Sequence, residues 1–266
     1  LQLVIQLPYM AKFGMLPRLS FRFSDPAIKK IFLLMAPATF GIGIYQLNLF
    51  VTMWFSSRLP EGAVSYLYDA GRLMELPLGI FAVSVTTAVL PSLSEQVAKK
   101  EWDGVKSSLS FAVRLVNFVT IPATVGLLVL SVPIVEALFR RGEFSTVDAA
   151  GTASALYWYA LGLVPVAVSR IFISVFYSMK DTATPVWIAF LAFIVNALFC
   201  FALVGPMGHN GLALATTLSS AVNCVVLFVI LKKRLGRIGA TEVIASGLKS
   251  LGASLVMGLA IYLIVF

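Results

Sequence analysis

Long apolar runs separated by short polar segments constrain this chain more than any other feature. An α-helix needs roughly 20 apolar residues to cross the hydrocarbon core of a membrane. Six runs of this kind follow one another, at 31–56, 65–91, 109–132, 152–176, 186–204 and 211–231. Only 12% of the 266 residues are charged, whereas soluble domains carry about 25%. The sequence therefore predicts an all-α integral membrane protein.

The two ends of the sequence resemble interrupted helices. Residue 1 is not Met and residues 1–10 read as the end of an apolar span, while a further apolar run begins near Ala245 and reaches Phe266. We expect a fragment of a longer membrane protein in three parts. These are 1–30, the end of a preceding helix with a basic loop; 31–235, a six-helix transmembrane lobe; and 236–266, a linker with the start of a further helix.

The loops between the runs alternate in charge. One set is basic and holds Lys12, Arg18, Arg22, Lys29, Lys30, Lys99, Lys100, Lys106, Lys180, Lys232, Lys233, Arg234, Arg237 and Lys249. The intervening loops hold only Arg58, Arg140 and Arg141. The positive-inside rule makes the first set cytoplasmic, so the run 31–56 points outward and the run 65–91 points inward. These loops account for the net charge of +8 without a nucleic-acid partner.

Several runs contain proline, including Pro77, Pro122 and Pro165. A proline removes a backbone hydrogen bond and kinks a helix, and membranes tolerate this where neighbours or a cavity satisfy the freed carbonyl. Such kinks are typical of a bundle that moves, although membrane helices are in general rich in proline and glycine.

The segment 94–107, between the second and third runs, is polar apart from Val97, Trp102 and Val105. This pattern predicts a short amphipathic helix on the cytoplasmic membrane surface. A plain solvated connector is the alternative interpretation.

The sequence shows no motif of an enzyme. It holds no GxxxxGK[ST] loop, no HExxH and no GxSxG, and the loops lack the paired acids of a membrane glycosyl or phosphoryl transferase. Cys200 and Cys224 lie in apolar runs without metal-ligand spacing, so we interpret them as free buried thiols. His209 lies in a Gly/Pro-rich turn and is interpreted as a surface residue. We expect a protein that is not an enzyme and carries no cofactor.

Arg72 is the residue most suggestive of function, because it lies inside the run 65–91. A charge at membrane depth is costly, and seven helical residues place it about 10 Å below the outer surface. Asp69 and Glu75 stand three residues before and after it, on one stripe of a helix. Two interpretations stay open: an intrahelical triplet that neutralises itself, or a cationic contact for a phosphate, whose oxygens a guanidinium binds in pairs.

Further polar residues lie within the runs, namely Gln46, Asn48, Thr52, Arg170, Asn196, Thr216 and Asn223. Hydrogen bonding between helices is the common role of such Asn, Gln and Thr side chains. Together with Arg72 they also indicate a polar cavity inside the bundle. The candidate substrate-binding residues are Arg72, Glu75, Asp69, Gln46, Asn48 and Arg170.

Four stretches of the sequence carry a family resemblance. QLNLFVTMWFSSRLPEGAVSYLYDAGRLMELPLGIFAVSVTTAVLPSLS (46–94) resembles the MurJ/MviN lipid II flippases of the multidrug/oligosaccharidyl-lipid/polysaccharide (MOP) exporter superfamily. PIVEALFRRGEF (133–144), VFYSMKDTATPV (175–186) and GHNGLALATTLSS (208–220) are similar as well. The resemblance covers nearly the whole chain, and four motifs in the right order make it specific.

The resemblance implies a fold and an activity. The family has fourteen transmembrane helices in two six-helix lobes plus two extra helices, and this chain matches the end of the sixth to the start of the thirteenth. It is thus similar to the C-terminal lobe of a flippase of the bacterial cytoplasmic (inner) membrane. Such a flippase moves lipid II, the lipid-linked peptidoglycan precursor, outward by alternating access. Its partners would be lipid II, membrane lipids, the absent N-terminal lobe and cell-wall synthesis proteins.

The resemblance also assigns roles to single residues. The cavity arginine of the family's eighth helix falls on Arg72, which would contact the diphosphate, while Glu75 and Asp69 would orient it. The sodium ligands of some members fall on Thr52, Asn196, Cys200 and Thr216. Those members have acids at two of these positions, where this chain has Thr52 and Cys200. Because a hard cation prefers oxygen ligands and negative charge, we expect no sodium site of that kind here.

Two other functions remain as alternatives. A related exporter of another polyprenyl-linked oligosaccharide or of a drug would share the fold, although a drug exporter is expected to lack the stretches 133–144 and 175–186. A non-transporting membrane scaffold for cell-wall enzymes would not need polar groups inside its helices.

Overall fold

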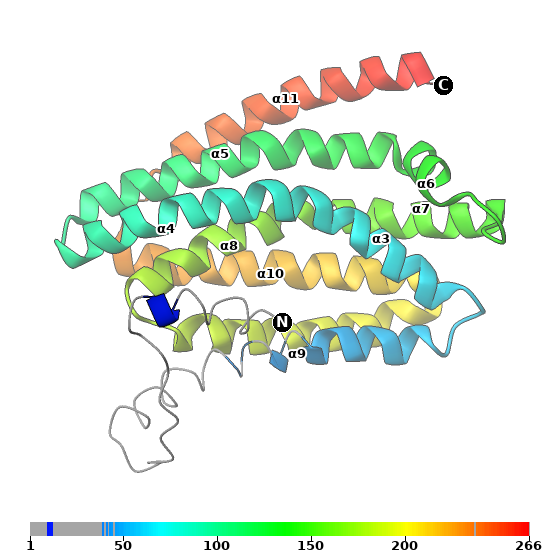
Figure 1. Cartoon of the computed structure of the whole chain (residues 1–266), viewed down its shortest axis with the longest axis horizontal. Helices are drawn as coiled ribbons and strands as arrows, with labels where there is room; N and C mark the ends of the chain where they lie inside the picture. The colour runs from blue at the N-terminus through cyan, green and yellow to red at the C-terminus, as the bar shows by residue number, and fades with distance from the viewer. Residues whose placement is uncertain are drawn as a thin grey trace, which may run out of the picture. The chain divides into compact units, whose positions relative to one another are not determined.

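The computed structural model describes residues 10–12, 39, 41, 43–44, 46–236 and 238–265, and its regular structure over these residues is helical (Figure 1). The chain divides into two compact units, Leu1–Pro37 and Ala38–Phe266. In the first unit only residues 10–12 are described, and they are helical. The rest of the predicted segment 1–30 and the beginning of the run 31–56 lie outside the described residues.

The second unit is a bundle of long helices. Residues 46–56 form its first described helix. The following elements are α3 (Ala63–Pro77), a π-helical turn (Leu78–Ala82), α4 (Val83–Ala98), α5 (Trp102–Val129), α6 (Ser131–Phe139), α7 (Thr146–Ala160), α8 (Leu163–Ser178), α9 (Ala183–Met207), α10 (His209–Leu235) and α11 (Ala240–Val265). Within the described ranges, five helical segments are long and apolar enough to cross a membrane, and the bent pair α7–α8 raises this to six. The predicted class, an all-α membrane protein, is confirmed.

The helices differ from the predicted runs in two informative places. The second run becomes one segment of 36 residues, Ala63–Ala98, because a π-helical turn carries the chain past Pro77. The fourth run, predicted at 152–176, consists of two helices that meet at 45°. The bend lies at Gly162, where a Cβ would come within 2.9 Å of Thr217 Oγ1 on α10. Glycine thus permits a close approach of helices at the point where the span changes direction.

The segment 94–107 forms neither of the two structures considered for it. α4 continues to Ala98, α5 begins at Trp102, and Lys100 in the turn between them has a left-handed φ of 59°. Gln96 and Ser108 exchange hydrogen bonds of 3.0 Å across this turn. The prediction of an interfacial helix is therefore wrong: the polar residues are the adjoining ends of two long helices.

Two helix pairs show how small residues set the packing. α9 and α10 form a tight hairpin through Gly208, whose φ is 57°. A Cβ on Gly211 would overlap the carbonyl oxygen of Leu203, so only glycine lets these helices approach so closely. α11, expected to begin near Ala245, begins at Ala240 and is 26 residues long. It lies along α5 (Figure 1), and a Cβ on Gly258 would come within 2.7 Å of Val125.

The buried side chains form two clusters, one in each half of the bundle. The first joins α4, α5, α8 and α10, with Leu109, Ile171 and Phe176 almost fully buried. The second joins α3, α7, α9 and α10 around Leu67 and Leu156. The same helices also carry large apolar side chains on their exposed faces. This is expected where lipid rather than water surrounds the helices.

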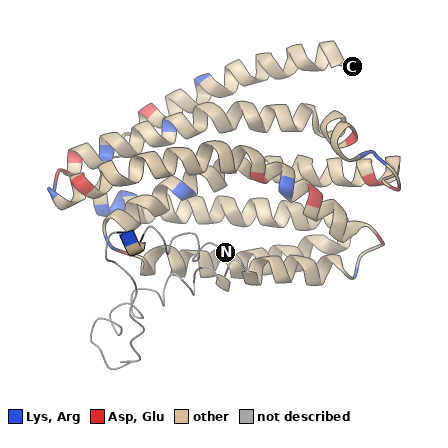
Figure 2. Ribbon diagram, viewed as in Figure 1, with Lys and Arg blue, Asp and Glu red and all other residues tan. Residues whose placement is uncertain are grey.

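Charge is distributed unequally between the two ends of the bundle. Figure 2 shows lysine and arginine gathered at the left end, where the turns α4–α5, α8–α9 and α10–α11 lie. The turns 57–62 and 140–145 lie at the opposite end. The bundle therefore brings the turns of the predicted cytoplasmic set within the second unit, 99–101, 179–182 and the described part of 236–239, together at one end, as a membrane orientation by positive charge requires.

Candidate functional site

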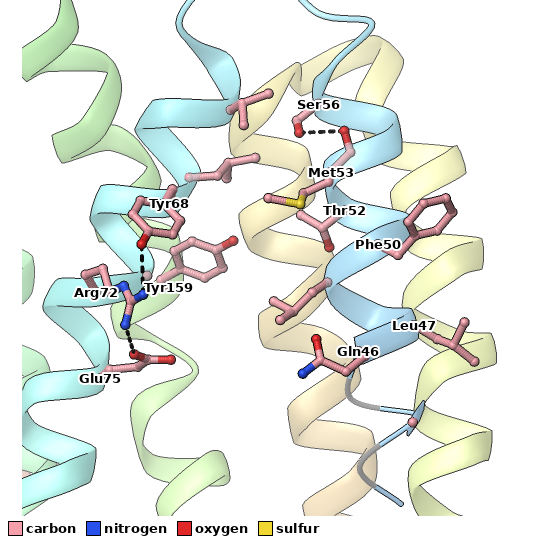
Figure 3. Close-up of a pocket in the computed structure, with 15 residues that line it drawn as sticks. Gln46, Leu47, Phe50, Thr52, Met53, Ser56, Tyr68, Arg72, Glu75 and Tyr159 are labelled. Carbon is pink, nitrogen blue, oxygen red and sulfur yellow. Dashed lines mark hydrogen bonds and ion pairs between the residues drawn. The ribbon is translucent and has the colours of Figure 1, made fainter. Parts of the chain in front are cut away.

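A cavity of about 770 Å³ separates the helix 46–56 from α3 (Figure 3). Much of its wall is apolar, with Leu49 and Met53 of the helix 46–56 and Leu67 of α3 among its lining residues. Its polar lining residues are Gln46, Thr52, Ser56, Tyr68, Arg72, Glu75 and Tyr159. Among its described lining residues the cavity thus combines an apolar wall with the cation of Arg72, a combination that suits an amphipathic anionic molecule.

Arg72 lies on the wall of this cavity with 60% of its side chain exposed. Its Nη2 donates a hydrogen bond of 2.8 Å to the Tyr68 hydroxyl, and its Nη1 lies 3.4 Å from Glu75 Oε2. The guanidinium carbon also lies 4.9 Å from the centre of the Tyr68 ring, within cation–π range. Figure 3 shows these three side chains on one edge of α3, facing the helix that carries Gln46 and Thr52.

The sequence of α3 explains this arrangement. Tyr68, Arg72 and Glu75 are spaced four and three residues apart, so they share one face of the helix. Leu67, Ala70 and Leu73 form the opposite, buried face, and α3 packs against α7 through it. Arg72 lies nine residues after the start of α3, which places it about 14 Å from the outer end of the helix.

A second hollow adjoins the first on the other side of the same charged pair. It has a volume of about 560 Å³ and is lined by Arg72, Glu75 and Leu76 together with Leu138 and Phe139 of α6. Arg72 and Glu75 therefore lie between two adjoining hollows and line both of them. The structure therefore shows the intrahelical pair of the first interpretation, and it places that pair on an open wall rather than in the packed interior.

The other candidate residues are distributed more widely. Gln46 lines the cavity, whereas the side-chain oxygen of Asn48 is buried and has no hydrogen-bond partner among the described residues. Asp69 is half-buried on α3 and is not among the residues that line the hollows described. Arg170 on α8 lines a separate hollow of about 280 Å³ near Thr86 of α4. The structure therefore brings together Arg72, Glu75 and Gln46, but not the whole predicted set.

Three of the four residues considered for sodium meet between α9 and α10. Asn196 Nδ2 lies 3.5 Å from Thr216 Oγ1 and 3.3 Å from Ser219 Oγ, and the Cys200 thiol donates to Asn196 Oδ1 at 3.5 Å. The fourth, Thr52, donates to the carbonyl of Asn48 in its own helix and lines the large cavity instead. Thr216 likewise donates to the Leu212 carbonyl. These side chains are all neutral, and one of them is a thiol. The amide oxygen of Asn196 already accepts a hydrogen bond from Cys200. A hard cation prefers charged oxygen ligands, so this set does not fit one.

His209 is not the surface residue predicted. It begins α10, is half-buried, and its ring packs edge-on against Tyr66 with centroids 5.4 Å apart. Its Nε2 lies 3.2 Å from both the Gly151 carbonyl and Ser154 Oγ of α7. Tyr66 in turn donates to Asp148 at 2.8 Å. The histidine thus joins α3, α7 and α10 beside the outer end of the cavity.

The motif 175–186 contributes a contact at the cytoplasmic end of the bundle. Asp181 accepts hydrogen bonds from the backbone and hydroxyl of Thr184, at 2.9 and 2.7 Å, and pairs with Arg234 of α10 at 2.6 Å. Partial burial alone would raise the pKa of Asp181, but the bonds from Thr184 and the Arg234 charge outweigh it, so its pKa is lowered. The acid therefore fixes the start of α9 to the end of α10.

Tyr68 and Tyr159 are the site residues that sequence reasoning missed. Tyr68 precedes Arg72 by four residues, and this helical spacing was a usable signal for an arginine partner. Tyr159 reaches the cavity from α7, about ninety residues away in the chain, and no local pattern indicates it.

Comparison with solved structures defines the class of protein to which this geometry belongs. A structure described as lipid II flippase MurJ in an inward closed conformation superposes with a TM-score of 0.79 and 30% identity, over 94% of this chain and 51% of that one. An outward-facing multidrug resistance MATE family transporter of the MOP superfamily superposes with a TM-score of 0.64 at 14% identity, over 86% of this chain and 53% of that one. That second likeness concerns the fold alone. The helical bundle is a MOP-type transporter fold.

Sequence comparison narrows the class to one family. The family described as lipid II flippase MurJ matches residues 1–265. A probable lipid II flippase MurJ of Vibrio cholerae is 36% identical over 85% of this chain and 43% of its own length. One of Bdellovibrio bacteriovorus is 36% identical over 93% of this chain and 48% of its own length. The chain therefore belongs to the lipid II flippase MurJ family, whose members are multi-pass proteins of the bacterial cytoplasmic membrane, and it spans about half the length of these relatives.

Proposed function

We propose that this chain is one lobe of a flippase that carries lipid II from the cytoplasmic to the outer leaflet. The family supports this proposal, because the family and the relatives compared above are named for that substrate. The other lobe, cell-wall synthesis proteins and the surrounding lipids are the proposed partners. The same family membership favours a transporter that catalyses no covalent chemistry itself.

The observation that carries the proposal is the position of Arg72 on a largely apolar cavity wall. Lipid II combines a diphosphate with a long polyprenyl chain, so its binding site needs a cation next to apolar surface. Arg72 supplies the cation at about 14 Å along α3, and lining residues such as Leu49, Met53 and Leu67 supply apolar surface. We propose that the guanidinium binds the diphosphate, since its fork of donors suits phosphate oxygens.

Movement of the lobe against its partner lobe would open the cavity to each side in turn, as in other transporters with paired lobes. The bend between α7 and α8 and the π-helical turn after Pro77 are the irregular places in the spans. Both adjoin the cavity helices, and such interruptions commonly mark functional sites in helices. We further propose that the Asn196 cluster holds α9 to α10 and is not a sodium site.

The first experiment is genetic complementation in cells depleted of their own flippase, with Arg72→Ala in the complete transporter. We expect loss of growth at normal expression. We expect partial function for Arg72→Lys, because lysine keeps the positive charge but lacks the paired N–H donors of the guanidinium. Arg58→Ala is the matched control, because Arg58 also stacks on an aromatic ring, Trp54, at 3.6 Å, yet does not line the cavity. Normal growth and normal surface exposure of lipid II with Arg72→Ala would contradict the proposal.

A further inference from the structure

Two acceptors of different charge contact Arg72 among the residues that the structure describes. Tyr68 offers a neutral phenol oxygen at 2.8 Å from Nη2, and Glu75 offers a carboxylate at 3.4 Å from Nη1. The two nitrogens that would form a paired contact with a phosphate are therefore directed to separate partners. A phosphate that binds both nitrogens must compete with at least one of them.

Glu75 is the partner that can be exchanged. Its side chain is 54% exposed, its contact with Arg72 is long, and both residues line the two adjoining hollows. Ion pairs with this exposure contribute little to stability, because water and salt screen them. The shorter bond to Tyr68, reinforced by the stacking of the guanidinium on the ring, keeps the arginine in place when the carboxylate leaves.

Glu75 lies on the cytoplasmic side of Arg72 along α3. α3 runs from the outer end of the bundle towards the cytoplasmic end, and Glu75 follows Arg72 by three residues. The carboxylate therefore lies about one helical turn nearer the cytoplasm than the guanidinium. An anion that enters from the cytoplasmic side meets the negative charge at Glu75 next to the positive charge that binds it.

We propose that Glu75 is an internal counter-anion that the diphosphate displaces from Arg72 and that recaptures the guanidinium when the substrate leaves. This inference rests on the proposed function and specifies how the same site is regulated. Glu75 weakens binding in two ways, by competing for Nη1 and by repelling the phosphates. Weaker binding is useful to a transporter, because a site that holds its cargo too tightly releases it slowly.

The test is the affinity of the complete transporter, in lipid nanodiscs, for a polyprenyl diphosphate. Glu75→Gln keeps the size of the side chain and removes the charge, so we expect binding about two- to fivefold tighter, the range for loss of one exposed charge interaction. Lipid II translocation by the same variant should become slower at saturating substrate. Glu136→Gln is the matched control: Glu136 pairs with Arg140 at 3.3 Å with similar exposure, but does not contact Arg72.

Each outcome bears on one of the two proposals. Tighter binding by Glu75→Gln together with unchanged binding by Glu136→Gln supports the counter-anion. Equally tighter binding by both variants would show that the net negative charge of the lobe, rather than Glu75 itself, weakens diphosphate binding, and it would overturn the counter-anion proposal. Unchanged or weaker binding by Glu75→Gln would overturn it as well. Arg72→Ala in the same assay separates the proposals, because undiminished diphosphate binding by Arg72→Ala contradicts the proposed contact itself, whatever Glu75→Gln does.

Discussion

The Asp181–Arg234 contact offers the sharpest test of how this bundle is stabilised. Asp181→Asn removes the charge but keeps one oxygen that can accept from the Thr184 backbone. Asp181 is only 19% exposed, while Arg234 is 42% exposed, so the ion pair is partly screened. Hydrogen bonds to charged groups contribute about 1.5–3 kcal/mol and exposed ion pairs about 0–1 kcal/mol. We therefore expect a loss of about 2 kcal/mol.

The assay is thermal unfolding of the complete transporter in detergent at one fixed scan rate, since such transitions are often irreversible. A loss of this size corresponds to a fall in apparent Tm of about 2–4 °C, because the complete transporter is about twice as long as this chain and its unfolding entropy is correspondingly larger. Asp103→Asn is the control, because Asp103 pairs with Lys106 at 3.0 Å but is 99% exposed. Its Tm should change by less than about 1 °C. Equal Tm values for the two variants would refute the argument from burial.

The dependence on pH follows from the lowered pKa of Asp181. A carboxyl whose folded-state pKa is depressed stabilises the protein fully above its unfolded pKa, about 3.9, and loses that contribution as the pH falls through the folded value. The Tm difference between the wild type and Asp181→Asn should therefore be constant from about pH 7 to pH 5 and shrink below about pH 4. A difference that grows on acidification would contradict the assigned sign.

Two further predictions concern the α9–α10 hairpin. Gly211→Ala should lower the Tm clearly, because a Cβ there overlaps the Leu203 carbonyl, whereas Gly205→Ala, with nothing within 4 Å of its Cβ, should leave the Tm unchanged or slightly raised. Replacing KCl by NaCl at constant ionic strength should leave the Tm of the wild type unchanged, because the Asn196 cluster lacks a carboxylate. A sodium-specific rise in Tm that Asn196→Ala abolishes would show that the cluster binds the ion.

Several features of this protein could be predicted from the sequence because the membrane imposes them locally. A helix must satisfy its own backbone in lipid, so an apolar run of sufficient length specifies a span without knowledge of its neighbours. The charged loops specify the sidedness in the same local way. Arg72 was recognisable for a related reason, since a charge within a run is costly wherever the run packs. The family motifs added the number of helices and the placement of the lobe.

Two of the departures from prediction involved contacts between distant segments. At the bend, Thr217 of another helix lies so close to Gly162 that a Cβ there would come within 2.9 Å of its hydroxyl. The sequence predicts His209 as a surface turn residue, whereas in the structure it contacts Tyr66 and Gly151. No spacing rule could anticipate these contacts, because the partners lie more than fifty residues apart in the chain.

For the site, the sequence determined that a cation and two acids share a stripe of one helix, and it left open whether they neutralise one another. The tertiary structure adds the surroundings: Arg72 pairs with Glu75 on the wall of an apolar cavity, across from the helix 46–56, and α6 lies beside a second hollow. The physical reason is that the energy of a charge depends on what surrounds it. A helical stripe fixes which side chains are neighbours, but the packing of other helices fixes whether that stripe faces protein or open space.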